Sequence, residues 1–175
     1  KKIISQNDLA AIVMEVSRNF KPNLKFLKEI RKLSQKKNIV LIFDECTSGF
    51  RETYGGLHKK YKINPDLAIF GKALGNGYAI TSIIGKKNIM KFADESFISS
   101  TFWTERIGYA AALKTLEVMK IKKSWQIITN TGNKIRNKWK KIAKKNKLKI
   151  KIYGLPSLSR FEIKSQNWIK YKTYI

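Results

Sequence analysis

Residues that form disulfides and soft metal sites are scarce in this sequence. Its 175 residues include one cysteine, Cys46, and one histidine, His58. One cysteine excludes an internal disulfide, and the two side chains together cannot supply the tetrahedral ligand set of a structural zinc site. We therefore expect no metal centre.

Long apolar runs are also missing. No run approaches the roughly 18–20 residues that span a bilayer, and no basic and then apolar leader opens the chain. We therefore expect a cytoplasmic protein that does not enter a membrane. The hydrophobic content of 43% suffices for a filled core. The chain starts with Lys1 rather than Met, and neither end has a tail of low hydrophobicity. We therefore expect a fragment of a longer protein.

Acidic residues are few. The sequence contains 12 Asp and Glu residues and 37 Lys and Arg residues, so its net charge is +25. A charge of this size is consistent with binding to nucleic acid. Lysine far outnumbers arginine, however, and lysines occur in nearly every segment. In the densest stretch, residues 134–151, Ile135, Trp139, Ile142 and Leu148 recur at roughly helical spacing, so most of its lysines can form the solvated face of an amphipathic helix. The pattern disfavours nucleic-acid binding, which stays a rival interpretation.

The first part of the chain alternates short apolar runs with one amphipathic segment. The runs have the polar or glycine flanks of buried strands and cover residues 9–15, 39–45, 67–71, 79–85 and 96–100. Between the first two, Pro22 can sit in the first turn of a helix, whose apolar stripe comprises Leu24, Leu27, Ile30 and Leu33. Strand, helix and strand in this order predict a parallel crossover unit. The continuous apolar run of residues 39–43 predicts a sheet covered on both faces.

The second part has a different order of elements. Thr104 is suited to cap a long helix that runs through Met119, and a second helix is predicted over about residues 124–145. Residues 149–153 and 158–163 then read as a hairpin-like pair of strands. Because parallel units give way to helix, helix, strand and strand, we expect a domain change near residue 115, with one domain over residues 1–115 and a second over residues 116–175.

Two strand ends carry residues suited to chemistry. Asp44 and Glu45 end a hydrophobic strand, where Asp44 either caps the following turn, pairs with Arg51 or serves a ligand. Lys72 lies between another short strand and a glycine-rich turn. It is either an ordinary solvated lysine or a desolvated and therefore more nucleophilic amine.

The two features are informative together. A buried carboxylate can keep a pyridine nitrogen protonated, and a desolvated amine can form an imine with an aldehyde on the same ring. A phosphate-binding P-loop around Lys72 is excluded, because Asp66 stands where its first glycine is needed and Ala73 replaces the required Ser or Thr.

Several motifs resemble those of class-III aminotransferases, which are pyridoxal phosphate (PLP) enzymes of fold type I. FDECTSGFR (residues 43–51) is similar to their FDEVxTGFR motif, and NPDLAIFGKALGNGYAI (64–80) to the stretch with the cofactor lysine. DLAAIVMEVSRN (8–19), SSTFWTERIGYAAALKTLEVM (99–119) and GLPSLSRFEI (154–163) follow in family order. The resemblance implies an α/β fold: the second half of the large, mainly parallel-sheet domain and the start of the small α+β C-terminal domain.

The resemblance also implies roles for residues around the cofactor, pyridoxal 5'-phosphate. Lys72 matches the Schiff-base lysine and proton shuttle, and Asp44 matches the partner of the pyridine nitrogen. Cys46 stands at the position, usually valine, that packs on the ring face. Thr101 matches a threonine that reaches the cofactor phosphate of the neighbouring subunit, which implies a homodimer with shared active sites.

Further residues place the chain near one branch of the family. Glu15 matches a supporting glutamate of the active-site strand, and Asn19 is expected to make a polar contact near the cofactor. Asn19 and the Phe50-Arg51 pair resemble glutamate-1-semialdehyde aminomutases and similar aminotransferases. Three departures leave the substrate open: Val16 replaces proline, Asn76 replaces glycine, and residues 104–106 replace Gly-Asn-Pro.

The implied activity is transfer of an amino group between a small-molecule donor and an oxo acid or aldehyde. An intramolecular aminomutase uses the same residues, and the sequence does not decide between the two reactions. A catalytically dead relative is a further alternative, which the presence of both Asp44 and Lys72 disfavours.

Overall fold

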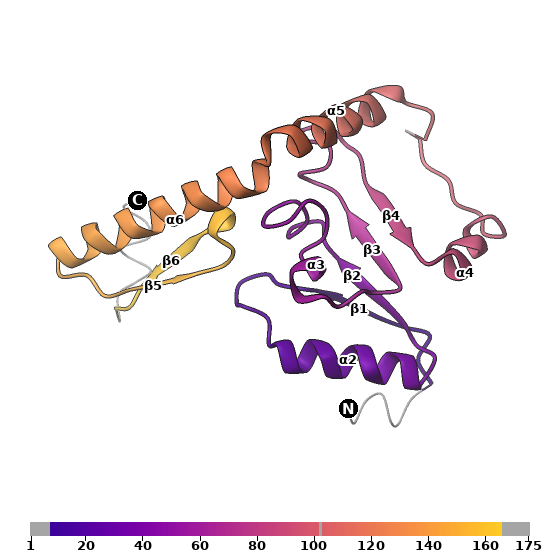
Figure 1. Ribbon diagram of the computed structural model, residues 1–175, viewed down its shortest axis with the longest axis horizontal. Helices are drawn as coiled ribbons and strands as arrows, with labels where there is room; N and C mark the ends of the chain where they lie inside the picture. Colours follow the sequence, from indigo (N-terminus) through magenta and orange to yellow (C-terminus); the bar gives the residue numbers. More distant parts are fainter. Residues whose placement is uncertain (1–7, 102, 166–175) are drawn as a thin grey trace.

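A four-stranded sheet forms the centre of the first part of the chain (Figure 1). The structure is a computed structural model and describes residues 8–101 and 103–165. The strands follow one another across the sheet: β1 (Ala11–Glu15), β2 (Val40–Asp44), β3 (Leu67–Phe70) and β4 (Ser82–Gly85). β1, β2 and β3 are parallel, whereas β4 is antiparallel to β3. The expected α/β class with a mainly parallel sheet is confirmed.

Helix α2 (Leu24–Lys36) makes the crossover between β1 and β2. Its N-cap is Asn23, whose side chain accepts a hydrogen bond from the backbone N–H of Phe26 at 3.2 Å. Pro22 therefore precedes the cap, and the prediction that it lies in the first turn was wrong. The apolar stripe buries Leu27 almost completely and leaves Leu24 exposed, so the helix packs through its middle turns.

Two hydrophobic clusters hold the elements together. In the first, Leu27 of α2 packs with Leu41 and Phe43 of β2, which are fully buried. The second joins Phe70 of β3 to Ala112 of a long later helix. The sheet is thus covered by helices from two parts of the sequence.

The second part of the chain begins with two consecutive helices, α5 (Arg106–Lys122) and α6 (Ser124–Lys145). Lys123 separates them with a left-handed φ of 50°. Figure 1 shows α5 beside the sheet and α6 leading away from it. The N-cap of α5 is Glu105 rather than Thr104, so that prediction was wrong. α5 runs through residue 115, and the domain division there stays a prediction.

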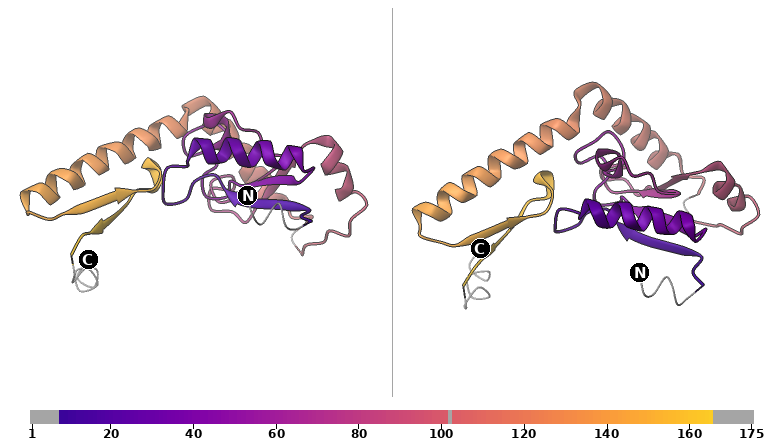
Figure 2. Two further views of the ribbon diagram at one scale, coloured as in Figure 1. Left: turned by 90° about the horizontal axis from the view of Figure 1, so that it is seen from below. Right: turned by 60° about the horizontal axis from the view of Figure 1, so that its bottom comes forward.

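Strands β5 (Ile150–Tyr153) and β6 (Arg160–Ile163) form the predicted antiparallel pair. A short 3-10 helix, η2 (Pro156–Leu158), connects them, and the pair lies along α6 in both views of Figure 2. Trp139 of α6 contacts Phe161 of β6, with ring centroids 5.1 Å apart. Most lysines of α6 face solvent, as the amphipathic pattern predicted.

Several boundaries differ from the sequence prediction. Residues 96–100 do not form a strand, and they follow helix α4 (Lys87–Met90) and η1 (Lys91–Ala93) as exposed irregular chain. β4 starts at Ser82 instead of residue 79, because the chain is still turning there: the N–H of Ile80 bonds the carbonyl of Tyr78. The short helix α3 (His58–Tyr61) was not predicted. Within the described ranges, no helix is long and apolar enough to cross a membrane.

Candidate active site

The candidate site lies at the carboxyl ends of the parallel strands. Glu15 ends β1, and it is in register with Asp44 at the end of β2. Lys72 follows β3 by two positions, and Asp44 pairs with Ile69 of that strand. Parallel strands gather such residues at one edge of a sheet, where α/β proteins usually bind ligands.

Asp44 is half-buried, and its Oδ1 accepts a hydrogen bond of 2.9 Å from the backbone N–H of Cys46. The predicted capping of the turn is therefore confirmed. The alternative of an ion pair with Arg51 was wrong, since none forms among the described residues. The carboxylate also interacts with the Cys46 thiol, and a carboxylate has enough lone pairs to accept a further hydrogen bond from an N–H of a ligand.

Lys72 occupies a left-handed conformation with φ of 45°, which non-glycine residues adopt only when their surroundings impose it. Its Nζ donates a hydrogen bond of 2.7 Å to Oγ1 of Thr47. The side chain is exposed, so of the two alternatives for Lys72 the solvated amine is the one found and the desolvated amine was wrong. Next to it, a Cβ on Gly71 would lie 3.3 Å from Sγ of Cys46, which keeps the two turns in close contact.

Cys46 lies between the carboxylate and the lysine. Burial raises the pKa of its thiol, and the hydrogen bond and negative charge of Asp44 raise it further, against the opposing charge of Lys72. A thiol with a raised pKa stays protonated and is a poor nucleophile. This environment suits the packing role that the family resemblance implies.

The three remaining predicted residues are placed differently. Glu15 is close enough for its charge to act on Cys46, and Nε of Arg18 lies 3.7 Å from its Oε2. Thr101 is exposed in a turn before α5. Asn19 contacts the C-terminal strand pair: its carbonyl accepts from N–H of Gly154 at 2.7 Å, and its Oδ1 accepts from Arg160 at 3.1 Å. Among the described residues, only Glu15 of these three interacts with the group formed by Asp44, Cys46 and Lys72. The cofactor roles of Glu15, Asn19 and Thr101 stay predictions.

Sequence reasoning missed the residues of the turn that follows β2. Thr47 holds the amine of Lys72, and Glu45, not Asp44, is the fully buried carboxylate. Glu45 accepts hydrogen bonds from Oγ of Ser48 and from the backbone N–H of His58, whose Nδ1 is 2.9 Å from Oε1. The His58 ring does not bond Ser48, so this is no nucleophilic triad. The adjacent acidic pair in the sequence was the available signal.

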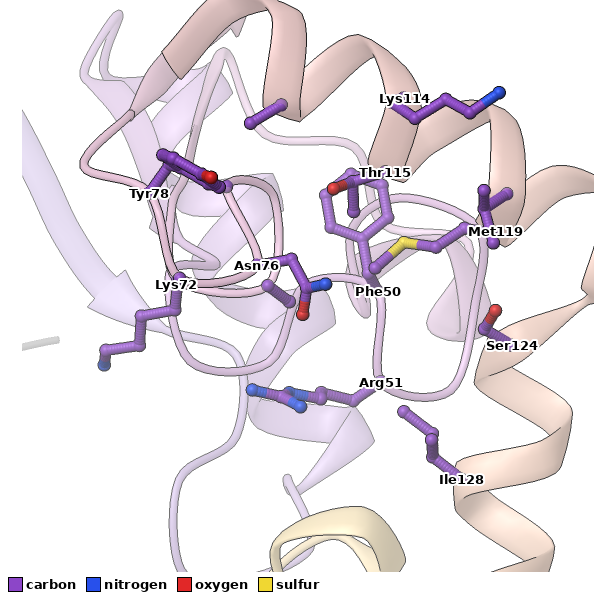
Figure 3. Close-up of a pocket in the computed structure, with 15 residues that line it drawn as sticks. Phe50, Arg51, Lys72, Asn76, Tyr78, Lys114, Thr115, Met119, Ser124 and Ile128 are labelled. Carbon is purple, nitrogen blue, oxygen red and sulfur yellow. The ribbon is translucent and has the colours of Figure 1, made fainter. Parts of the chain in front are cut away.

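A cavity of about 740 Å³ opens beside Lys72 (Figure 3). Its walls come from the turns after β2 and β3 and from α5 and α6, with Arg51, Asn76, Tyr78 and Met119 among the lining residues. Asn76 adopts a φ of 47°, and asparagine tolerates this region better than most residues. The cavity volume lies in the usual range for small-molecule sites, about 300–1,000 Å³.

These residues fit pyridoxal phosphate. Lys72 offers an exposed amine for the aldehyde, and Asp44 offers a half-buried carboxylate that can accept a further hydrogen bond from the ring nitrogen. Cys46 stands between them as a small half-buried side chain. Lys72, Asp44 and Cys46 thus offer partners for the aldehyde, the ring nitrogen and the ring face, respectively.

Comparisons with known proteins show which family the sequence matches. The sequence profile of the family Aminotransferase class-III matches residues 2–173. The 3-aminobutyryl-CoA aminotransferase of Cloacimonas acidaminovorans is 34% identical over 86% of the chain and 37% of the relative. A glutamate-1-semialdehyde 2,1-aminomutase of Methanococcoides burtonii is 32% identical over 88% of the chain and 38% of the relative. The chain thus spans less than two-fifths of the length of either protein.

The same fold occurs in solved structures. The FumI protein of Sphingopyxis sp. MTA144, in its PLP internal aldimine form, matches with a TM-score of 0.87. The match covers 95% of this chain and 42% of that one, at 21% sequence identity. The backbone arrangement is therefore that of part of a PLP-dependent fold.

Proposed function

Because this chain belongs to the class-III aminotransferase family, we propose that it carries the catalytic lysine and the ring-nitrogen partner of a PLP-dependent aminotransferase. The reaction moves an amino group between a small-molecule donor and an oxo acid or aldehyde. The observation that carries the proposal is the pair of Asp44 and Lys72 at neighbouring parallel strand ends. In this proposal Glu15 supports the active-site strand, and Asn19 makes a polar contact near the cofactor.

Lys72 has two tasks in this proposal. Its amine would hold the cofactor covalently through the aldehyde, with water as the leaving group, and the free amine would carry a proton to and from the reacting carbon. Thr47 accepts a hydrogen bond from this amine at 2.7 Å, so Thr47 orients Lys72 while it is free. The positive φ of Lys72 fixes the direction in which the side chain leaves the turn.

Asp44 and Cys46 act on the ring. PLP supplies an electron-accepting pyridine ring when bound, provided that its nitrogen keeps a proton. Asp44 would accept a hydrogen bond from that N–H and so favour the protonated ring nitrogen, while its Oδ1 also accepts from the N–H of Cys46. Cys46, whose thiol pKa is raised by burial and by Asp44, would pack against the ring without competing for the aldehyde.

A glutamate-1-semialdehyde 2,1-aminomutase is the second candidate. It is supported by the relative of that name at 32% identity. Both reactions need the same lysine and aspartate. They differ in whether an external oxo acid completes the turnover, so product analysis with and without such an acid distinguishes them.

Assembly and location are also part of the proposal. A homodimer with shared active sites is supported by the exposed position of Thr101 and by exposed large apolar side chains such as Phe97 and Trp103. A cytoplasmic location stays a prediction. The rival of a nucleic-acid-binding protein is disfavoured because exposed lysines occur on α2, α5, α6 and β5 alike.

The decisive experiment uses the complete protein that carries this chain. After addition of PLP we expect a visible absorption band, which borohydride abolishes while fixing the cofactor to the peptide containing Lys72. A Lys72→Ala variant should show neither the band nor the labelled peptide. Attachment at another lysine, or no uptake at all, contradicts the proposal.

A further inference from the structure

Arg51 carries a charge that has no anionic partner among residues 8–101 and 103–165. Its side chain is half-buried, and Nε donates one long hydrogen bond of 3.4 Å to the carbonyl of Thr47. Within the described residues, its other guanidinium nitrogens make no hydrogen bond and no ion pair. Burial also lowers the pKa of Arg51 below its ordinary value. A guanidinium has five donors, and most of them are unused here.

The backbone of Arg51 is held independently of its side chain. Its N–H bonds the carbonyl of Ser48 at 3.3 Å, and its carbonyl accepts from Oγ1 of Thr129 on α6 at 3.0 Å. These two bonds fix the backbone from which the guanidinium extends, whereas the described part of the chain provides no counter-ion for its charge. Burying part of a charge in this way is unfavourable unless something pairs with it.

The cavity that Arg51 lines has an excess of positive charge. Its lining includes Arg51, Lys72 and Lys114 but no Asp or Glu. Lys114 is already paired with Glu117 at 2.8 Å, so the charges of Arg51 and Lys72 remain to be balanced. An oxyanion with two coplanar oxygens matches the fork of a guanidinium.

Arg51 and Lys72 are close enough to serve one small molecule. Both bind the same residue, Lys72 through Oγ1 of Thr47 and Arg51 through the carbonyl of Thr47. Figure 3 shows both side chains extending to the same side of the turn that carries Asn76. A molecule that reacts at the Lys72 amine can therefore place a second group at Arg51.

We propose that Arg51 binds an oxyanionic group of the substrate, a carboxylate or a phosphate. The preferred amino donors and acceptors then carry such a group in addition to the reacting carbon, and neutral amines are poor substrates. This inference rests on the proposed function and adds a substrate class and a binding residue to it.

The test is calorimetric titration of the complete protein that carries this chain, with succinate and, separately, with inorganic phosphate. Each titration is made with and without PLP. Arg51→Met should raise the Kd of the anion by about 10- to 100-fold, because a charge-assisted bidentate contact is lost. Arg51→Lys should lose less, since it keeps the charge. Arg106→Met removes an exposed arginine at the start of α5 and should bind like wild type.

A kinetic measurement adds a second criterion. In Arg51→Met, KM for anionic donors should rise by the same factor, while KM for neutral amine donors stays unchanged. Thermal unfolding of both Arg51 variants verifies that they fold, and Arg51→Lys carries the test if Arg51→Met does not.

Three outcomes overturn the inference: wild type that binds neither anion, binding that is unaffected by substitution of Arg51, or Arg51 variants that weaken PLP uptake while the loaded protein binds succinate normally. The last would assign the guanidinium to the cofactor phosphate. Failure of the proposed function looks different. The protein would take up no PLP, yet succinate or phosphate would still bind through Arg51.

Discussion

At the scale of single residues, Asp44 is the side chain whose charge matters most for the proposed reaction. Asp44→Asn keeps an Oδ1 that can accept from the N–H of Cys46 at the observed 2.9 Å, so the turn should be preserved. The amide cannot hold a proton on the ring nitrogen, and we expect kcat to fall by about 100-fold or more. Steady-state kinetics with a saturating donor measures this.

The matched control is Asp94→Asn, which makes the same change at an exposed position outside the site and should leave kcat unchanged. Cofactor uptake by Asp44→Asn, followed by visible absorption, separates lost chemistry from lost binding. Wild-type kcat in Asp44→Asn would show that the ring nitrogen has another partner.

The sequence indicated some site residues and could not indicate others. Asp44 and Lys72 were predictable, because each directly follows an apolar run and parallel strands bring such ends together. Thr47 and Arg51 were not, since their contacts depend on how the turn after β2 folds back. The sequence also left open whether Lys72 is solvated or desolvated, because burial of a turn depends on what packs over it.

At the scale of elements, the contact between α6 and η2 depends on Gly132. A Cβ at this position would lie 2.0 Å from the carbonyl oxygen of Pro156. Gly132→Ala gains about 1 kcal/mol of helix propensity, but the backbone of η2 must move, and overpacking costs about 1–3 kcal/mol. We expect a net loss of stability, with faster hydrogen exchange in residues 150–163.

Asn133→Ala is the control for this substitution. Asn133 is the next residue along α6 and is exposed, so alanine there should raise the unfolding midpoint slightly through propensity alone. If Gly132→Ala stabilises the protein as much as Asn133→Ala does, the packing of η2 on α6 is looser than the structure indicates.

Asp66 joins three elements through one carboxylate. It accepts two hydrogen bonds from Arg31 of α2 at 2.7 and 3.0 Å and one from the N–H of Leu41 in β2 at 2.9 Å. Lys86, just after β4, lies 2.7 Å away. Burial alone would raise the pKa of Asp66, but Arg31, Lys86 and Leu41 together hold it well below its ordinary value.

A pKa lowered by folding has a defined consequence for stability. Asp66 contributes fully above its unfolded pKa of about 4, and the contribution is lost as the pH falls below that value. Asp66→Asn should therefore lower the free energy of unfolding by about 3 kcal/mol at pH 7, with the difference from wild type shrinking below pH 4. Urea unfolding of both proteins at pH 7 and at about pH 3 measures this difference. Glu117→Gln, in an exposed pair, should cost less than about 1 kcal/mol.

Local pattern was enough to predict most elements. The amphipathic spacing gave the helix over residues 124–145, and the apolar runs gave the strands that became β1, β2 and β3. The prediction of a strand over residues 96–100 is wrong, because a short apolar run acquires strand geometry only beside a partner. The antiparallel direction of β4 depends on how the chain turns between Gly75 and Ser82, which periodicity does not encode.

At the scale of the whole molecule, much apolar surface is uncovered. Val13 of β1 and Ile83 of β4 are 63% and 52% exposed, and they lie on the two edge strands of the described sheet. Unpaired edges and exposed apolar side chains favour association between chains. We therefore expect these 175 residues, expressed alone, to self-associate at micromolar concentration.

Sedimentation velocity over a concentration series tests this expectation. Replacing Val13 and Ile83 by lysine should shift the distribution toward monomer, whereas replacing Lys120, an exposed lysine of α5, by glutamine should not. A wild-type chain that sediments as a monomer and unfolds cooperatively would mean that the exposed surface needs no cover.

The bond between Asn19 and Arg160 bears on the order in which the chain folds. These partners are 141 positions apart, whereas Glu45 and His58 are 13 apart. Closing the longer loop costs about 2 kcal/mol more chain entropy if nothing has formed in between. We therefore expect the sheet and the buried Glu45 turn to form first and the C-terminal strand pair to dock last. The hydrogen bonds of Asn19 to Arg160 and Gly154 should then form last. The C-terminal strand pair is therefore the part of the molecule that should open most readily.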